Sequence, residues 1–90
     1  MHNVDVVKSK LKISRDKVNN MVKAKNSDIA HINNKIKEQL PEFEQTGNKK
    51  KLVPLLKAKK DLETFVENAE VRVKLLNEKL SEVEMQQVNV

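Results

Sequence analysis

Between Leu52 and Val83 the chain carries a seven-residue apolar repeat with a single polar interruption, at Lys59. The apolar positions follow one another at intervals of three, four or seven residues: Leu52, Leu55, Leu62, Val66, Ala69, Val73, Leu76, Leu80 and Val83. A helix places residues at these intervals on one narrow stripe, which is stable when another helix covers it. The repeat therefore predicts a long helix packed lengthwise against a second helix.

A weaker repeat runs through the first half of the chain, where Ser14 and Lys25 interrupt it. Its apolar positions are Val7, Leu11, Val18, Val22, Ile29, Ile32, Ile36 and Leu40. Asn3 or Asp5 can cap the start of this helix with a side-chain oxygen. Pro41 is expected to end it, because proline lacks a backbone N–H and restricts the residue before it. The first helix is therefore predicted over about 5–40.

Residues 41–50 contain a proline, the single glycine and an asparagine, a composition typical of a turn. Asn48 is a candidate N-cap for a second helix that begins between residues 49 and 53 and runs to about 88. Pro54 then falls in the first turn, where proline is tolerated. The sequence thus predicts one all-α domain over 1–90, a long antiparallel two-helix hairpin. Self-association into a bundle is a further option.

The net charge of +5 arises from 18 Lys and Arg against 13 Asp and Glu, and the two signs occupy different stretches. Residues 8–25 and 49–60 are basic, whereas residues 61–84 carry an excess of acids. In a hairpin that folds back near residues 45 and 46, residue i lies opposite residue 91 minus i. Ion pairs across the hairpin would then favour this register. Uncompensated positive charge is expected at the tip.

The residues that catalysis and metal binding require are absent or isolated. There is no cysteine, and only two histidines, His2 and His31, occur. His31 has no potential ligand three or four residues after it. We therefore expect no enzyme, no metal site and no cofactor. Two phenylalanines provide little stacking surface for single-stranded nucleic acid, and Pro41 breaks the continuous basic helix that a leucine zipper needs. Nucleic acid is therefore disfavoured as a partner.

Three stretches of the chain resemble the ESCRT-III family, the charged multivesicular body proteins. NKKKLVPLLKAKKDLETFV is similar to the start of that family's second helix, and KISRDKV to a run near the beginning of its core. LNEKLSEVEMQQV is similar to a later motif, at Leu76, Leu80, Val83, Glu84, Gln87 and Val88. The RDK run and the VEMQQV ending look most like the charged multivesicular body protein six, or vacuolar-sorting, subgroup. Pro54, and Asp61 with Leu62, depart from the family pattern.

The resemblance implies that the chain is the core hairpin of a longer subunit of a membrane-remodelling filament in endosomal sorting. It implies a cytoplasmic protein on endosomal membranes, with other ESCRT-III subunits, ESCRT-II and an anionic membrane as partners. An AAA ATPase would be recruited only by later helices. The candidate membrane residues are Lys8, Lys10, Lys12, Arg15, Lys17, Lys23 and Lys25. The candidate partner contacts lie off the main repeat, at Phe65, Val71, Leu75, Met85 and Val88.

Two alternatives to this reading stay open. The second apolar row can be buried by self-association instead of by a different subunit. A soluble coiled-coil adaptor, or a chaperone of the tubulin-cofactor type, is the competing function. That chaperone family has three helices, whereas the break at residues 41–50 leaves two here. An adaptor predicts a defined oligomer and no lipid binding, whereas a filament subunit predicts both lipid binding and polymerisation.

Overall fold

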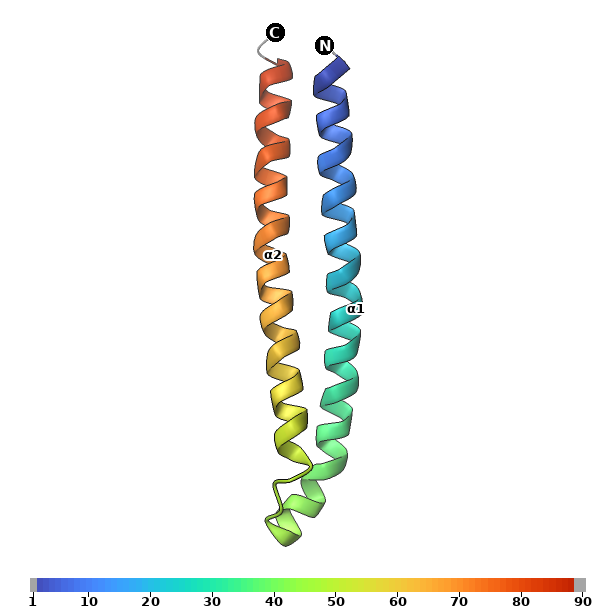
Figure 1. Cartoon of the computed structure of the whole chain (residues 1–90), viewed down its shortest axis with the longest axis vertical. Helices are drawn as coiled ribbons and strands as arrows, with labels where there is room; N and C mark the ends of the chain where they lie inside the picture. Colours follow the sequence, from blue (N-terminus) through green and yellow to red (C-terminus); the bar gives the residue numbers. More distant parts are fainter. Residues whose placement is uncertain (1, 89–90) are drawn as a thin grey trace. The chain divides into compact units, whose positions relative to one another are not determined.

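The computed structural model describes residues 2–88 of the chain, and side chains within 4–86. It contains two α-helices, α1 (His2–Thr46) and α2 (Leu52–Val88), joined by a short loop (Figure 1). No strand occurs in the described part of the chain. The prediction of an all-α two-helix hairpin is therefore confirmed. Both helices are longer than the average helix of a globular protein. Because most helical stability in proteins comes from tertiary packing, each helix depends on the apolar stripe that it packs against the other.

Contacts divide the chain into two compact units, each of which contains part of both helices. Unit 1 consists of Met1–Val22 and Asn68–Val90, and unit 2 consists of Lys23–Glu67. Unit 1 thus pairs the start of α1 with the end of α2, whereas unit 2 holds the connecting loop and the helix segments on either side of it. Each unit supplies its own set of surfaces.

The stripe of α2 that packs against α1, which we call the α2 seam, is the one that the repeat predicts. Leu52, Val66 and Leu80 are buried. The remaining predicted positions are half-buried, and they include the polar one: Leu55, Lys59, Leu62, Ala69, Val73, Leu76 and Val83. The spacing alternates strictly between three and four residues along the whole seam. This is the pattern of two helices that pack side by side over a long distance.

The corresponding α1 seam differs from the prediction at several positions. It follows the same alternation of three and four through the half-buried or buried residues Val4, Lys8, Leu11, Arg15, Val18, Val22, Lys25, Ile29, Ile32, Ile36, Gln39 and Phe43. Val7 and Leu40, which the sequence assigned to this seam, are 43% and 40% exposed. Arg15, and not Ser14, fills the position between Leu11 and Val18. The prediction named Val7 and Leu40, the apolar neighbours of the seam residues Lys8 and Gln39.

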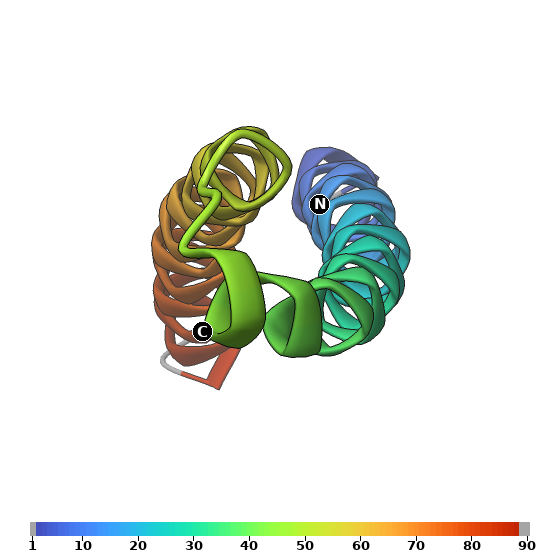
Figure 2. The same ribbon diagram turned by 90° about the horizontal axis from the view of Figure 1, so that it is seen from below.

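The end of α1 also lies later than predicted, because the helix continues through Pro41 to Thr46. Proline at this position cannot donate a backbone hydrogen bond to the preceding turn. In Figures 1 and 2 the last turns of α1, drawn in green, slant toward the start of α2. The helix ends where Gly47 adopts a positive φ of 69° and its N–H donates to the Phe43 carbonyl over 2.7 Å. This is the glycine C-cap that commonly terminates helices.

The loop that follows is held by short-range hydrogen bonds. The Thr46 hydroxyl donates to the Glu42 carbonyl over 2.8 Å and accepts the N–H of Asn48 over 3.2 Å. Asn48 Oδ1 accepts the N–H of Lys50 over 3.0 Å, a bond of the type that caps a helix start. Asn48 therefore caps the turn that leads into α2, and it is not the residue next to Leu52, where the helix begins. The start of α2 lies within the predicted interval, and Pro54 falls in its first turn.

At the other end of the hairpin, the predicted cap of α1 is wrong. The helix already includes His2, so Asn3 and Asp5 lie inside it and cannot be its N-cap. Asp5 is in the first turn, where a negative charge interacts favourably with the helix dipole. An acidic residue can stabilise a helix start either as the N-cap or inside the first turn. The residue type alone therefore does not predict where the helix begins.

Candidate interaction surfaces

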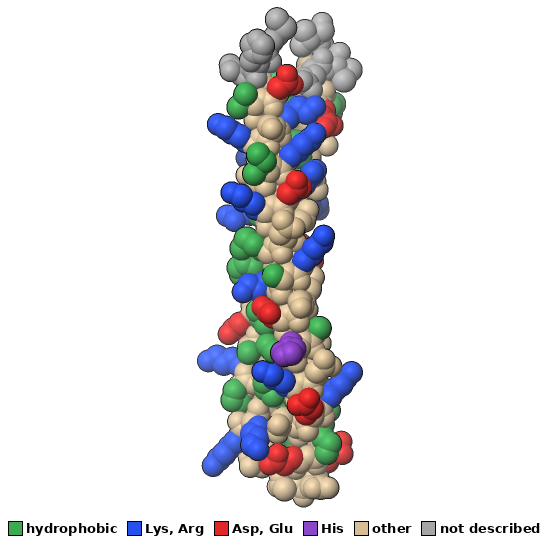
Figure 3. Space-filling view, turned by 90° about the vertical axis from the view of Figure 1, so that its right-hand side faces the viewer, with side chains coloured by type: hydrophobic (Ala, Val, Ile, Leu, Met, Phe, Trp, Pro, Cys, Tyr) green, Lys and Arg blue, Asp and Glu red, His purple; other side chains and the backbone are tan. Residues whose placement is uncertain are grey.

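The seven basic residues predicted to contact a membrane lie on three different sides of α1. Three of them occupy seam positions and are half-buried: Lys8, Arg15 and Lys25. The other four are exposed: Lys10, Lys12, Lys17 and Lys23. Figure 3 looks onto the α1 side and shows cationic side chains projecting along it, with acidic ones between them. The seven residues therefore do not form one basic face.

Arg15 and Lys25, which occupy seam positions of α1, contact residues of α2. The Arg15 guanidinium donates to Asp16 Oδ1 and to Asn77 Oδ1, each over 3.4 Å. Lys25 Nζ lies 5.4 Å from the centre of the Phe65 ring, within the range of a cation–π interaction. Both contacts join residues close to those that the predicted register places opposite one another. We therefore exclude Arg15 and Lys25 from a surface that is free to bind a flat partner.

The predicted pairing of the basic stretch with acidic side chains across the hairpin is not made by Arg15, whose carboxylate partner is its neighbour Asp16. A second ion pair joins Lys51 Nζ to Glu42 Oε2 over 3.5 Å, and it spans the loop in unit 2. Both pairs involve exposed carboxylates, and such pairs contribute roughly 0–1 kcal/mol to stability. The apolar seam therefore contributes more to holding the helices together than these two ion pairs do.

Each unit has two flanks beside its seam, and helical spacing assigns residues to them. In an antiparallel pair, residues that directly follow a seam position lie on one flank in both helices, and residues that directly precede one lie on the other. In unit 1, Asn19 follows Val18 and Asn77 follows Leu76, and both line one open groove together with Glu70 and Lys74, as this assignment expects. Glu82, which precedes Val83, also reaches this groove. We call this side of unit 1 the groove flank.

The opposite side of unit 1, which we call the basic flank, collects cations from both helices. α1 contributes Lys10 and Lys17, which precede seam positions, and α2 contributes Arg72 and Lys79. All four side chains are exposed. The acid that precedes a seam position in this unit, Glu82, lines the groove on the other side. The groove flank has an excess of acids. Its two lysines are Lys12 and Lys74, and its four acidic residues are Asp5, Asp16, Glu70 and Glu84. Unit 1 is therefore electrostatically two-sided.

Arg72 and Lys79 are the residues of the basic flank that sequence reasoning missed. They lie within the stretch that has an excess of acids, so the local charge balance concealed them. Their position immediately before Val73 and Leu80 was available from the repeat. The signal that could have found them is the heptad position of each cation in both helices, and not the charge of each stretch.

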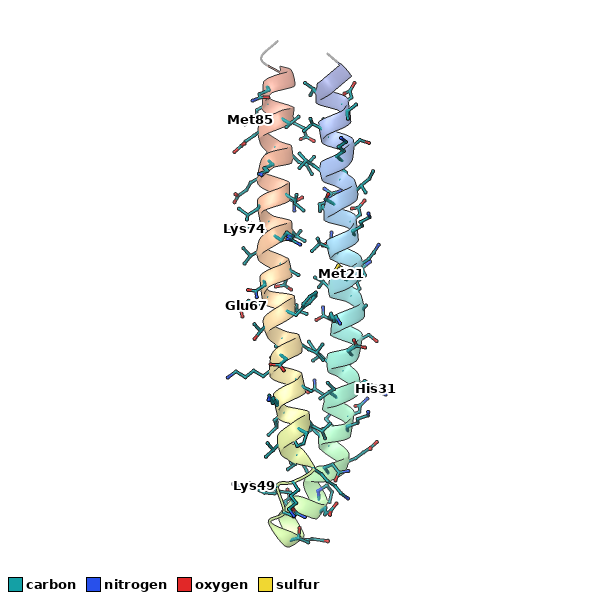
Figure 4. The ribbon with its side chains drawn as sticks, viewed as in Figure 1. Met21, His31, Lys49, Glu67, Lys74 and Met85 are labelled. Carbon is teal, nitrogen blue, oxygen red and sulfur yellow. The ribbon has the colours of Figure 1, made fainter. Side chains whose placement is uncertain are left out.

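The predicted partner contacts also divide between the units. In unit 1, Val71, Leu75 and Met85 are exposed on α2, and Met85 points away from α1 in Figure 4. Leu75 directly precedes the seam residue Leu76, so it lies where the outer side of α2 meets the basic flank. Glu78 and Glu82 continue the same row, so the apolar surface is interrupted. Phe65 belongs to unit 2, where its ring lies beneath Lys25. The side chain of Val88 lies outside the described residues.

The described part of the chain contains no group of three or more histidine, cysteine or acidic residues that could hold a metal ion. His31 is exposed on the surface of α1 (Figure 3). Within the described residues, neither helix has the length and apolar character needed to cross a bilayer.

Comparison of the chain with protein-family models, with curated proteins and with solved structures gave no match.

Proposed function

We propose that this chain is the hairpin core of an ESCRT-III-like filament subunit, which binds an anionic membrane and assembles with other subunits. The observation that carries the proposal is the basic flank of unit 1. Lysine and arginine side chains near an anionic bilayer contribute about 1 kcal/mol each to binding. Lys10, Lys17, Arg72 and Lys79 come from both helices, so a membrane can contact them together. The resemblance in the KISRDKV and LNEKLSEVEMQQV stretches supports the same function.

Assembly would use the outer side of α2 in unit 1. Val71, Leu75 and Met85 are large apolar side chains that α1 leaves exposed. Contact with another helix would remove their surface from water, which favours association by about 25 cal/mol per Å². We propose other ESCRT-III-like subunits as the occupants, with ESCRT-II as a further partner. We also propose a cytoplasmic location on endosomal membranes, as the family resemblance implies.

The test is co-sedimentation with phosphatidylcholine vesicles and with mixed phosphatidylcholine–phosphatidylserine vesicles over a salt series. The double variant Lys10→Glu/Lys17→Glu should weaken binding to the anionic vesicles by about tenfold or more, because each reversal replaces an attraction by a repulsion. Lys12→Glu/Lys74→Glu is the matched control, since it makes the same charge change on the groove flank of the same unit. The control should bind within about threefold of the original chain.

Negative-stain microscopy of the vesicle pellets tests the assembly half of the proposal. Filaments on anionic vesicles that disappear in Leu75→Ser/Met85→Ser, with vesicle binding retained, are the expected result. Equal loss of binding in the two charge-reversed variants would contradict the role of the basic flank, because it would indicate net charge alone.

A coiled-coil adaptor is the second candidate function, and the same exposed row on α2 favours it. Val71, Leu75 and Met85 would then be covered by a third helix in an oligomer of fixed size. Analytical ultracentrifugation distinguishes the candidates. A defined dimer or tetramer together with no binding to anionic vesicles at low salt would replace the filament proposal by the adaptor.

A further inference from the structure

In unit 2, three large apolar side chains are exposed on one flank of the hairpin near the loop. Val53 is 55% exposed, Leu56 is 52% exposed and Leu40 is 40% exposed. Each directly follows a seam position, namely Leu52, Leu55 and Gln39, so all three lie on the same flank although they come from both helices. The α1 seam cannot cover them, because packing against α2 uses the neighbouring positions.

Lysines occupy the same flank on both helices. Lys37 follows the seam residue Ile36, and Lys60 follows Lys59, so the two lie one helical turn from Leu40 and Leu56 respectively. Both are exposed. We call the five residues Lys37, Leu40, Val53, Leu56 and Lys60 the tip patch. Its acidic neighbours on this flank are Glu44 and Glu63, one turn beyond it on each helix.

The sequence around the loop adds to this positive charge. From Gln45 to Lys60 the chain contains six lysines and no acidic residue. Lys51 pairs with Glu42, but Lys49, Lys50 and Lys57 are exposed, and Lys57 lies next to Leu56 on α2. Figure 4 marks Lys49 in the loop. Exposed leucine and valine side chains thus lie among lysines at one end of unit 2.

We propose that the tip patch inserts its apolar side chains into the interfacial region of an anionic bilayer while its lysines contact lipid headgroups. This inference rests on the proposed function and assigns the membrane a second contact, separate from the basic flank of unit 1. Apolar residues ringed by lysines are the combination that an anionic membrane interface accommodates. Leucine and valine enter the acyl boundary, and lysine side chains extend to the phosphates.

Two other polyanions fit the patch less well. Nucleic acid would satisfy the lysines, but it gives Val53, Leu56 and Leu40 no apolar phase, and the patch has no aromatic side chain on which bases could stack. An acidic helix of another protein would need a groove to cover its apolar side. One groove of this unit lies on the other flank, where Lys35, Gln39, Lys51 and Leu55 line it.

The first measurement uses the full chain and the mixed anionic vesicles. Val53→Gln/Leu56→Gln removes apolar surface from the patch and keeps every charge. Val6→Gln/Ile13→Gln is the matched control, because Val6 and Ile13 are 50% and 55% exposed on α1 in unit 1. The patch variant should bind anionic vesicles about tenfold more weakly, and the control should bind within about threefold of the original chain. Circular dichroism checks that both variants remain helical.

The second measurement places a polarity-sensitive fluorophore at single positions, which is simple because the chain has no cysteine. The label on Val53→Cys should shift to shorter wavelength on anionic vesicles and be quenched by a lipid-borne quencher. The label on Ile13→Cys should do neither. A single-stranded oligonucleotide should leave the Val53→Cys label unchanged, because it offers charge without an apolar phase.

The outcomes separate this inference from the function on which it rests. If the chain binds anionic vesicles but the patch variant binds as tightly as the control and its label stays in water, the insertion of the tip patch is wrong and the proposed function stands. An equal response of the Val53→Cys label to the oligonucleotide also overturns it, in favour of a general polyanion site. If the original chain binds no anionic vesicles at low salt, the proposed function and this inference both fail.

Discussion

The α2 seam and the α1 seam differ in composition although they cover each other within each unit. The α2 seam is apolar at every position except Lys59. The α1 seam has polar residues at four positions, Lys8, Arg15, Lys25 and Gln39. The long stems of Lys, Arg and Gln still cover apolar surface, while their polar ends reach the edge of the seam. The apolar α2 seam therefore supplies most of the attraction, and α1 adapts to it.

Among the substitutions that test this difference, Leu80→Ala in α2 should have the largest effect on stability. Among the side chains that the structure describes, Leu80 is the most buried, at 5% exposure. Removal of its side chain should lower the free energy of unfolding by about 2–4 kcal/mol, as for other buried leucines. Urea unfolding followed by circular dichroism gives the value. Leu75→Ala on the outer side of the same helix is the control and should change stability by less than about 0.5 kcal/mol. Similar losses in both variants would show that the seam is not the main source of stability.

The same difference explains what could be predicted from the sequence. From Leu52 to Val83 the alternation of three and four residues is kept by apolar side chains at every position except Lys59, so that seam was found in full. In α1, three positions of the seam could be filled by either of two adjacent residues, because both fit the local spacing. These pairs are Val7 and Lys8, Ser14 and Arg15, and Gln39 and Leu40. Hydrophobicity favours Val7 and Leu40. The structure selects Lys8 and Gln39 because only they stay in register with Val18 and Val22.

The helix boundaries followed the same logic. Asn48 and Pro54 agreed on where α2 starts, and that start was predicted correctly. Either Pro41 or Gly47 could have ended α1, and the sequence analysis predicted the end at Pro41. The glycine ended the helix because it can adopt a positive φ and close the last turn with Phe43. The basic flank and the tip patch can be identified only when the seam positions of both helices are known. The net charge of each sequence stretch does not give those positions.

A smaller effect is expected at Pro41, where α1 accepts a residue that disfavours helix interiors. Pro41→Ala restores a backbone N–H and removes the clash with the preceding turn. The free energy of unfolding should rise by about 1–3 kcal/mol, up to the full difference between proline and alanine in a helix. Urea unfolding measures it, with Pro54→Ala as the control. Pro54 lies in a first turn, where proline is tolerated, so the control should gain less. A loss of stability in Pro41→Ala would mean that the slanted end of α1 depends on the proline.

The smallest effect separates the two possible registers at the end of α1. Gln39 occupies a seam position and is half-buried, whereas the adjacent Leu40 is exposed. Gln39→Leu should therefore stabilise the hairpin by about 1 kcal/mol, because it adds apolar surface where α2 covers it. Leu40→Gln should change stability by less than about 0.5 kcal/mol. The double variant keeps the composition and exchanges the two residues, so its stability should exceed that of the original chain. If the exchange lowers the free energy of unfolding instead, Leu40 is the seam residue and the α1 register is that of the hydrophobic row, with Val7 and Leu40 facing α2.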